Sequence, residues 1–170
     1  MDKNNEKIVY WTLLNHGQWK MYIAATEQGL CYAGPQNAPI DELAVWAKKR
    51  LPAYSLVEDQ VMLQPYTVEL IDYIKGKRKT FSRPVDLHGT AFQQTVWKAL
   101  QEIPYGQTVS YTDVAESIQK PQAVRAVGTA IGANPVLIIV PCHRVIGKNG
   151  KLTGFRGGLD MKEQLLALEK

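Results

Sequence analysis

The segment Val136-Leu137-Ile138-Ile139-Val140-Pro141-Cys142-His143-Arg144-Val145 joins a run of apolar side chains to a thiol and an imidazole. An apolar, β-branched run of this length predicts a buried strand or another buried extended segment. Pro141 has no backbone N–H to donate, so we expect the extended segment to end there. The sequence therefore places Cys142 and His143 at the edge of an apolar layer.

Cys142 is a candidate nucleophile. A cysteine reacts as the thiolate, and a nearby base or positive charge is the usual means of producing one. His143 and Arg144 supply such groups. The alternative is a buried structural cysteine with a chance histidine neighbour, because free cysteines are often small apolar residues of the core. Pro141 and Arg144 favour the functional interpretation, since packing alone does not require them.

A pair of helices is predicted upstream of this segment. Ser110 is placed to cap a helix that runs to about Ile118, and Asp113 completes a variant of the capping box. Pro121 suits the first turn of a second helix over residues 122–132. Two short helices joined by a tight turn are typical of a helix-turn-helix, although two helices packed in a core would fit the same pattern. Arg125 is a lone cation among the small side chains of the second helix.

The remaining patterns predict an α+β fold. An N-terminal domain (1–87) contains a three-stranded antiparallel sheet and helices, and a C-terminal domain (88–170) is mostly helical and resembles a winged helix-turn-helix. The strands are expected over 7–14, 18–25 and 29–33. The helices are expected from Asp41 to Arg50, over 58–75 with a possible break at Pro65, and after a Thr90 cap to about Ile103. Residues 76–79 are expected to form a basic linker.

The distribution of charge favours a partner that carries phosphate groups. The chain has 170 residues and a net charge of +4. Residues 88–170 hold nine basic and six acidic residues, and no acidic residue occurs between Ser117 and Leu159. A basic region without carboxylates suits nucleic acid, whereas an ordinary solvated surface is the alternative.

Other functional classes find little support in the sequence. The two cysteines, Cys31 and Cys142, are far apart and do not form a disulfide framework, and the N-terminus lacks an apolar signal core. We therefore expect a cytoplasmic protein without a membrane span. His16, Cys31 and His88 do not have the spacing of a zinc site, so no metal is expected. The absence of a phosphate loop or dinucleotide fingerprint predicts no cofactor.

The C-terminal half resembles the O6-alkylguanine-DNA alkyltransferases, also called methylated-DNA–protein-cysteine methyltransferases. The resemblance is carried by Asn134-Pro135, the Pro-Cys-His-Arg-Val motif, Gly157-Gly158-Leu159 and Lys162-Glu163. It extends back through Ile103-Pro104-Tyr105-Gly106, Val109-Ser110-Tyr111 and Arg125-Ala126-Val127-Gly128. It implies direct DNA repair, in which one alkyl group moves from O6-alkylguanine to the protein in a single irreversible turnover. Repair of O4-alkylthymine is left open.

The resemblance also implies roles for individual residues. Cys142 would be the nucleophile, His143 the base that takes its proton through a water molecule, and Glu163 the carboxylate that orients the imidazole. Asn134 would link the second helix to the active-site loop. Adjacent side chains on an extended backbone point to opposite sides, which fits a relay through water better than direct contact.

The substrate and DNA contacts are predicted in the same way. The residues expected to bind the flipped base are Tyr111, Leu137, Val145, Phe155 and Arg156. The residues expected to bind DNA are Arg125, which would replace the extruded base, together with Tyr111, Thr112, Lys120 and Lys148. Arg156 stands where relatives often have a small residue, so the size of alkyl group that fits is left open.

Two other functions are weighed against this one. A module that recognises alkylguanine without repairing it would resemble the alkyltransferase-like relatives, but these replace the cysteine. A Cys-His hydrolase would need an oxyanion hole and leaves the helix-turn-helix unexplained. The expected partner is double-stranded DNA, bound by a monomer.

Overall fold

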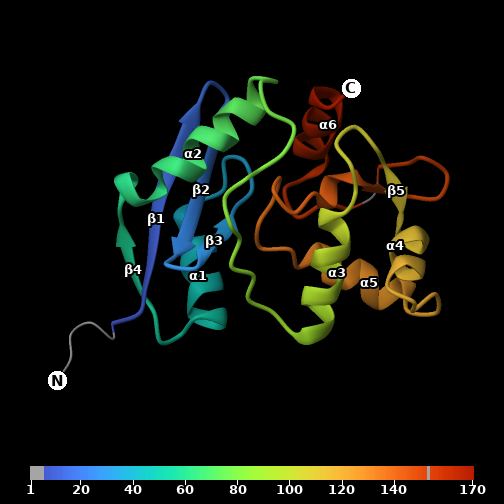
Figure 1. Ribbon diagram of the computed structural model, residues 1–170, viewed down its shortest axis with the longest axis horizontal. Helices are drawn as coiled ribbons and strands as arrows, with labels where there is room; N and C mark the ends of the chain where they lie inside the picture. Colours follow the sequence, from blue (N-terminus) through green and yellow to red (C-terminus); the bar gives the residue numbers. More distant parts are fainter. Residues whose placement is uncertain (1–5, 153) are drawn as a thin grey trace. The chain divides into compact units, whose positions relative to one another are not determined.

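The computed structural model describes residues 6–152 and 154–170. The chain divides into two compact units, with the boundary between His88 and Gly89 (Figure 1). Each unit has its own secondary structure and its own buried side chains. No helix in the described ranges combines the length and apolar character needed to cross a bilayer.

The first unit is built on a four-stranded sheet with the order β3-β2-β1-β4 (Figure 1). Strands β1 (Ile8–His16), β2 (Trp19–Thr26) and β3 (Gly29–Ala33) form the predicted antiparallel meander. The fourth strand, β4 (Ser55–Glu58), was not predicted, and it pairs in parallel with β1. All four of its residues are exposed, so it carries no pattern of buried side chains.

Two helices accompany this sheet. Helix α1 (Ile40–Arg50) begins after Pro39, so Asp41 lies in its first turn and does not cap it as expected. Helix α2 (Gln60–Ile74) is capped by Asp59, whose carboxylate accepts a hydrogen bond of 3.0 Å from Met62 N. The helix continues through Pro65 without a break. It buries Leu63, Leu70 and Tyr73, and this packing stabilises a helix despite an internal proline.

The end of the first unit adds to the edge of the sheet. Leu30 N donates to Pro84 O at 3.0 Å, and Asp86 N donates to Leu30 O at 2.8 Å. Gly29 has φ +153°, and a Cβ there would lie 2.7 Å from Pro84 O. The close approach of the two backbones therefore requires glycine.

The second unit contains the predicted helices and one further helix. Helix α3 (Ala91–Gln101) has a capping box made by Thr90 and Gln93, and α4 (Tyr111–Ser117) has one made by Ser110 and Asp113. Helix α5 (Val124–Gly132) starts two residues later than expected. The remaining elements are β5 (Val109–Ser110), the 3₁₀ turn η2 (Cys142–Arg144), β6 (Val145–Ile146) and α6 (Leu159–Leu168).

The two helices of the helix-turn-helix share a small apolar core. Helix α4 buries Val114 and Ala115, and α5 buries Val127, Ala130 and Ile131. Trp97 of α3 donates its indole N–H to Ala130 O at 2.8 Å, which fixes α5 against α3. Strand β5 pairs with β6 in parallel, with Val109 opposite Val145. This pairing brings the start of α4 close to the residue that follows Cys142–Arg144.

The apolar run before Cys142 does not form the predicted strand. It folds into a buried turn, in which Val140 N donates to Val136 O at 3.1 Å and Ile139 N donates to Leu137 O at 3.0 Å. Ile138 has φ +76°, a left-handed conformation that is rare for a β-branched side chain. The apolar pattern identified a buried segment, but tight backbone turns, invisible in that pattern, decide its shape.

Candidate active site

The thiol of Cys142 lies at the start of η2, with only 3% of the residue exposed. Asn134 Nδ2 donates a hydrogen bond of 3.2 Å to Cys142 Sγ. Burial raises the pKa of the thiol, while this hydrogen bond and the charges of Arg156 and Lys162 act in the opposite direction. Burial therefore favours the neutral thiol, and the groups around the sulfur favour its anion.

Asn134 connects the end of α5 to the active-site turn. Its Nδ2 also donates to Val140 O at 2.8 Å, and its Oδ1 accepts a bond of 2.9 Å from Val136 N. The residue is completely buried. One amide thus fixes both ends of the buried turn and contacts the sulfur.

The imidazole of His143 is fully buried, and its Nε2 lies 2.7 Å from Glu169 Oε2. Burial is the largest influence and lowers the pKa of His143. A neutral imidazole that donates from Nε2 to the carboxylate carries its lone pair on Nδ1. In the described part of the chain, Nδ1 has no hydrogen-bond partner. It is therefore available to receive a proton.

The carboxylate on His143 is Glu169, so the prediction of Glu163 for this role is wrong. Glu163 is exposed on α6, whereas Glu169 follows the last turn of that helix and is buried. Two hydrogen bonds of 2.8 and 2.9 Å from Arg144, and one of 3.2 Å from Gly106 N, also hold Glu169. The two glutamates are six residues apart and lie on different faces of the helix.

The structure of the turn η2 contradicts two other expectations. Because Cys142–Arg144 form a 3₁₀ turn, the side chains of Cys142 and His143 do not alternate across an extended strand. Arg144 lies in the acid-free region expected to face DNA, but it is only 6% exposed. Its guanidinium forms a bidentate ion pair with the carboxylate of Glu169. It therefore holds the site together from within and adds nothing to a DNA-binding surface.

Lys162 is a buried cation that the sequence analysis assigned no role. It is 0% exposed, and Nζ donates to Val145 O at 2.6 Å. Burial lowers the pKa of its ammonium group, and the interaction with Cys142 raises it. The helical pattern could have revealed Lys162 and Glu169, because both share the face of α6 that buries Leu165.

Two family profiles match the chain. The profile described as "6-O-methylguanine DNA methyltransferase, DNA binding domain" matches residues 91–170, and that described as "6-O-methylguanine DNA methyltransferase, ribonuclease-like domain" matches residues 9–87. The chain belongs to the O6-methylguanine DNA methyltransferase family. Membership confirms the resemblance found in the C-terminal motifs, and it extends over the N-terminal half.

Relatives in this family match the chain over nearly its whole length. The inducible methylated-DNA–protein-cysteine methyltransferase of Bacillus subtilis is 61% identical over 168 residues, which are 99% of this chain and 94% of the relative. The crystal structure of the Mycobacterium tuberculosis O6-methylguanine methyltransferase has a TM-score of 0.81 and 38% identity, and the match covers 96% of this chain and 93% of that one. Mycobacterium tuberculosis OGT in complex with DNA has a TM-score of 0.82 and 38% identity, over 95% and 92% of the two chains.

The part of the chain that matches the family's DNA-binding domain includes every residue predicted to contact DNA. Arg125 is exposed on α5, and Lys120 and Lys148 are exposed in loops. Thr112 is half-buried in the first turn of α4, and so is Tyr111. A Cβ built on Gly128 of α5 would lie 3.7 Å from the Tyr111 ring, so the ring is in close reach of that helix.

The predicted pocket residues fall into two groups. Leu137 and Val145 are completely buried, and they form part of the core of the second unit. Phe155 and Arg156 are half-buried in the segment before α6. Arg156 Nε donates to Asn134 O at 3.0 Å, so this segment is joined to the residue that contacts the thiol.

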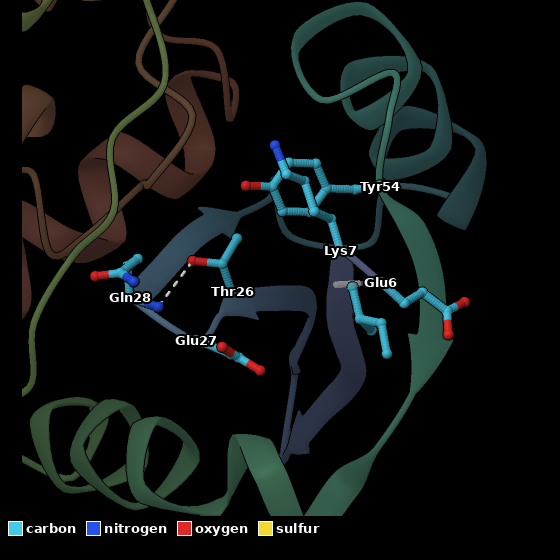
Figure 2. Close-up of a pocket in the computed structure, with 7 residues that line it drawn as sticks. Glu6, Lys7, Thr26, Glu27, Gln28 and Tyr54 are labelled. Atoms are coloured by element: carbon cyan, nitrogen blue, oxygen red, sulfur yellow. Dashed lines mark hydrogen bonds between the residues drawn. The ribbon is translucent and has the colours of Figure 1, made fainter. Parts of the chain in front are cut away.

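A cavity of about 170 Å³ lies in the first unit and contains none of the predicted site residues (Figure 2). Lys7 Nζ lies 5.6 Å from the centre of the Tyr54 ring on one side, and Gln28 N donates to Thr26 Oγ1 at 3.1 Å on the other. The described residues include no group of three His, Cys, Asp or Glu side chains suited to a metal ion. The candidate groups described above, Asn134, Cys142, His143 and Glu169, all belong to the second unit.

Proposed function

We propose that this chain repairs DNA by moving the alkyl group from O6 of a modified guanine to Sγ of Cys142. The enzyme class is that of its family, methylated-DNA–protein-cysteine methyltransferase. The observation that carries the proposal is the contact of the Cys142 thiol with Asn134, next to a buried imidazole that Glu169 holds. Cys142, His143 and Glu169 are thus the nucleophile, the base and the orienting group required to activate a thiol.

The chemical step is an in-line displacement. The Cys142 proton passes through a water molecule to Nδ1 of His143, and Glu169 stabilises the resulting imidazolium. The sulfur lone pair forms an S–C bond to the alkyl carbon while the C–O6 bond breaks. The electron pair of that bond passes to the guanine, which takes up a proton. The phenol of Tyr111 is the proposed hydrogen-bond donor to the base, since a tyrosine O–H can donate.

Transfer inside a duplex requires that the modified base leave the stack. Arg125 is exposed on α5, where a long cation can enter the gap left by the base. Lys120, Lys148 and Thr112 are proposed to contact the backbone on either side. Leu137, Val145, Phe155 and Arg156 are proposed to form the walls around the flipped guanine.

The product explains why each molecule acts once. Alkylated Cys142 is a thioether, and the mechanism assigns no group that could break its S–C bond. DNA is the macromolecular partner, as expected for a chain that contains the family's DNA-binding domain. We further propose that the substrate is O6-alkylguanine in double-stranded DNA, that the chain acts as a monomer, and that it works in the cytoplasm. The free thiols of Cys31 and Cys142 suit a reducing compartment.

The test is the mass of the intact protein after incubation with excess duplex containing O6-methylguanine. We expect a gain of one methyl group, which stops at one equivalent, and no gain for the variant Cys142→Ala. A stable complex without a change in mass would replace the proposal with a module that only recognises damage. Neither binding nor a gain in mass would exclude both.

A further inference from the structure

Arg156 is presented by a closely packed turn. Gly158 N donates to Phe155 O at 2.9 Å, so Arg156 and Gly157 form the corner of a four-residue turn. A Cβ on Gly157 would lie 2.5 Å from the Phe155 ring and 2.6 Å from Met161 Sδ. Because the corner is packed on one side, the direction of the neighbouring Arg156 side chain is restricted.

The half-buried Arg156 side chain reaches the backbone of Asn134, where Nε donates to the carbonyl oxygen at 3.0 Å. Asn134 follows the C-terminus of α5, where backbone carbonyls lack helical partners and carry partial negative charge. A cation is favourable at this position. The side chain of the same Asn134 donates to Cys142 Sγ, so one residue joins Arg156 to the nucleophile.

Several charged or titratable groups surround the sulfur. Arg156 comes from the turn before α6 and Lys162 from α6 itself, and the charges of both favour the thiolate. His143 comes from η2 and is held by Glu169, and burial lowers its pKa. Burial also lowers the pKa of Lys162, whereas a guanidinium stays protonated throughout the range in which a thiol titrates. Arg156 is thus a permanent positive charge near Cys142.

We propose that Arg156 is a positioning residue of the alkyl transfer, which holds Asn134 against the nucleophile and stabilises the thiolate of Cys142 by its charge. The inference rests on the proposed function for its biological meaning. The thiolate itself can be measured without DNA, so the two proposals fail independently.

The first experiment titrates the thiolate of the DNA-free protein by its ultraviolet absorbance. The same titration of Cys142→Ala is subtracted, and Cys31 contributes little because burial raises its pKa to about 12. Arg156→Gln removes the charge and keeps N–H donors, whereas Arg156→Lys keeps the charge. Lys151→Gln removes an exposed cation from the same loop and serves as the matched control.

We expect Arg156→Gln to raise the midpoint of the titration by about one pH unit, which is a tenfold loss of thiolate at neutral pH. Arg156→Lys should raise it by less than half as much, and Lys151→Gln should leave it unchanged. An unchanged midpoint in Arg156→Gln would overturn the inference. An equal shift in Lys151→Gln would also overturn it, because the loss of any positive charge from this loop would then raise the midpoint.

A second experiment separates thiolate stabilisation from a purely structural role. The rate of methyl transfer from saturating duplex is measured across the same pH range for the wild type and Arg156→Gln. The loss in the variant should be about tenfold near neutral pH. It should shrink at alkaline pH, where the Cys142 thiol ionises in the wild type and in the variant. A loss of equal size at every pH would assign Arg156 to structure alone and refute the electrostatic role.

Discussion

Replacing Glu169 with glutamine removes one negative charge from a buried network and keeps the shape of the side chain. Glu169 accepts hydrogen bonds from His143 at 2.7 Å and from Arg144 at 2.8 and 2.9 Å, and its side chain is 2% exposed. Arg144 is 6% exposed, so its guanidinium would remain buried without a counter-charge. Loss of one partner of a buried ion pair costs about 3–5 kcal/mol. We expect Glu169→Gln to lower the free energy of unfolding by that amount.

The assay is urea denaturation of Glu169→Gln beside the matched variant Glu163→Gln. With a slope of about 2 kcal/mol per molar urea, the expected loss moves the midpoint down by about 2 M. Glu163 is exposed on the same helix, so its substitution should change stability by less than about 0.5 kcal/mol. Methyl transfer should also slow in Glu169→Gln only, because His143 loses the carboxylate that stabilises its cation.

A further variant identifies the cause of the loss. Adding Arg144→Met to Glu169→Gln removes the uncompensated charge, so we expect the double variant to be more stable than Glu169→Gln alone. The reasoning is refuted if Glu163→Gln is as damaging as Glu169→Gln. It is equally refuted if Glu169→Gln costs less than about 1 kcal/mol.

Three other predictions concern pH, packing and DNA. The pKa of His143 is lowered below the unfolded value of about 6.5, so the unfolded state binds more protons below that pH. The stability of the wild type should therefore fall more steeply on acidification than the stability of His143→Gln. Equal slopes in urea denaturation at a series of pH values would contradict this. Gly157→Ala should cost about 1–3 kcal/mol by collision with Phe155, whereas Gly154→Ala, which has open space, should be nearly neutral in the same assay. Arg125→Ala should slow methyl transfer from duplex DNA more than transfer from a single strand, and equal losses would remove it from the role of replacing the flipped base.

Local signals in the sequence predicted much of the fold. Thr90 and Ser110 were recognised as helix caps, and both form full capping boxes. The strands expected over 7–14 and 18–25 correspond to β1 and β2 of the antiparallel meander, although β1 continues to His16. These features depend on residues within a few positions of one another, and side-chain chemistry is sufficient to specify them.

Features that depend on distant partners were missed. Strand β4 has four exposed residues and exists because it pairs with β1, which lies far away in the sequence. The apolar run before Cys142 folds into a turn because Asn134 bonds both Val136 N and Val140 O. Its composition alone could not distinguish that turn from a strand.

The candidate site shows the same division. The Pro-Cys-His-Arg-Val motif placed the thiol beside the imidazole, but it predicted an extended backbone where the structure has the buried turn η2. The partner of His143 was assigned to Glu163 by motif matching, although Glu169 has the correct position on the helix. Lys162, Leu165 and Glu169 recur at intervals of three and four residues, so their shared face could have been read from the sequence.

The central claim concerns a single sulfur atom, and mapping the transferred methyl group tests it most directly. The protein is incubated with duplex containing O6-methylguanine, digested, and its peptides are fragmented in a mass spectrometer. The account predicts that the added methyl lies on Cys142 and that Cys31 is unmodified. A methyl group on any other residue, or none on a folded protein that binds the duplex, would contradict it.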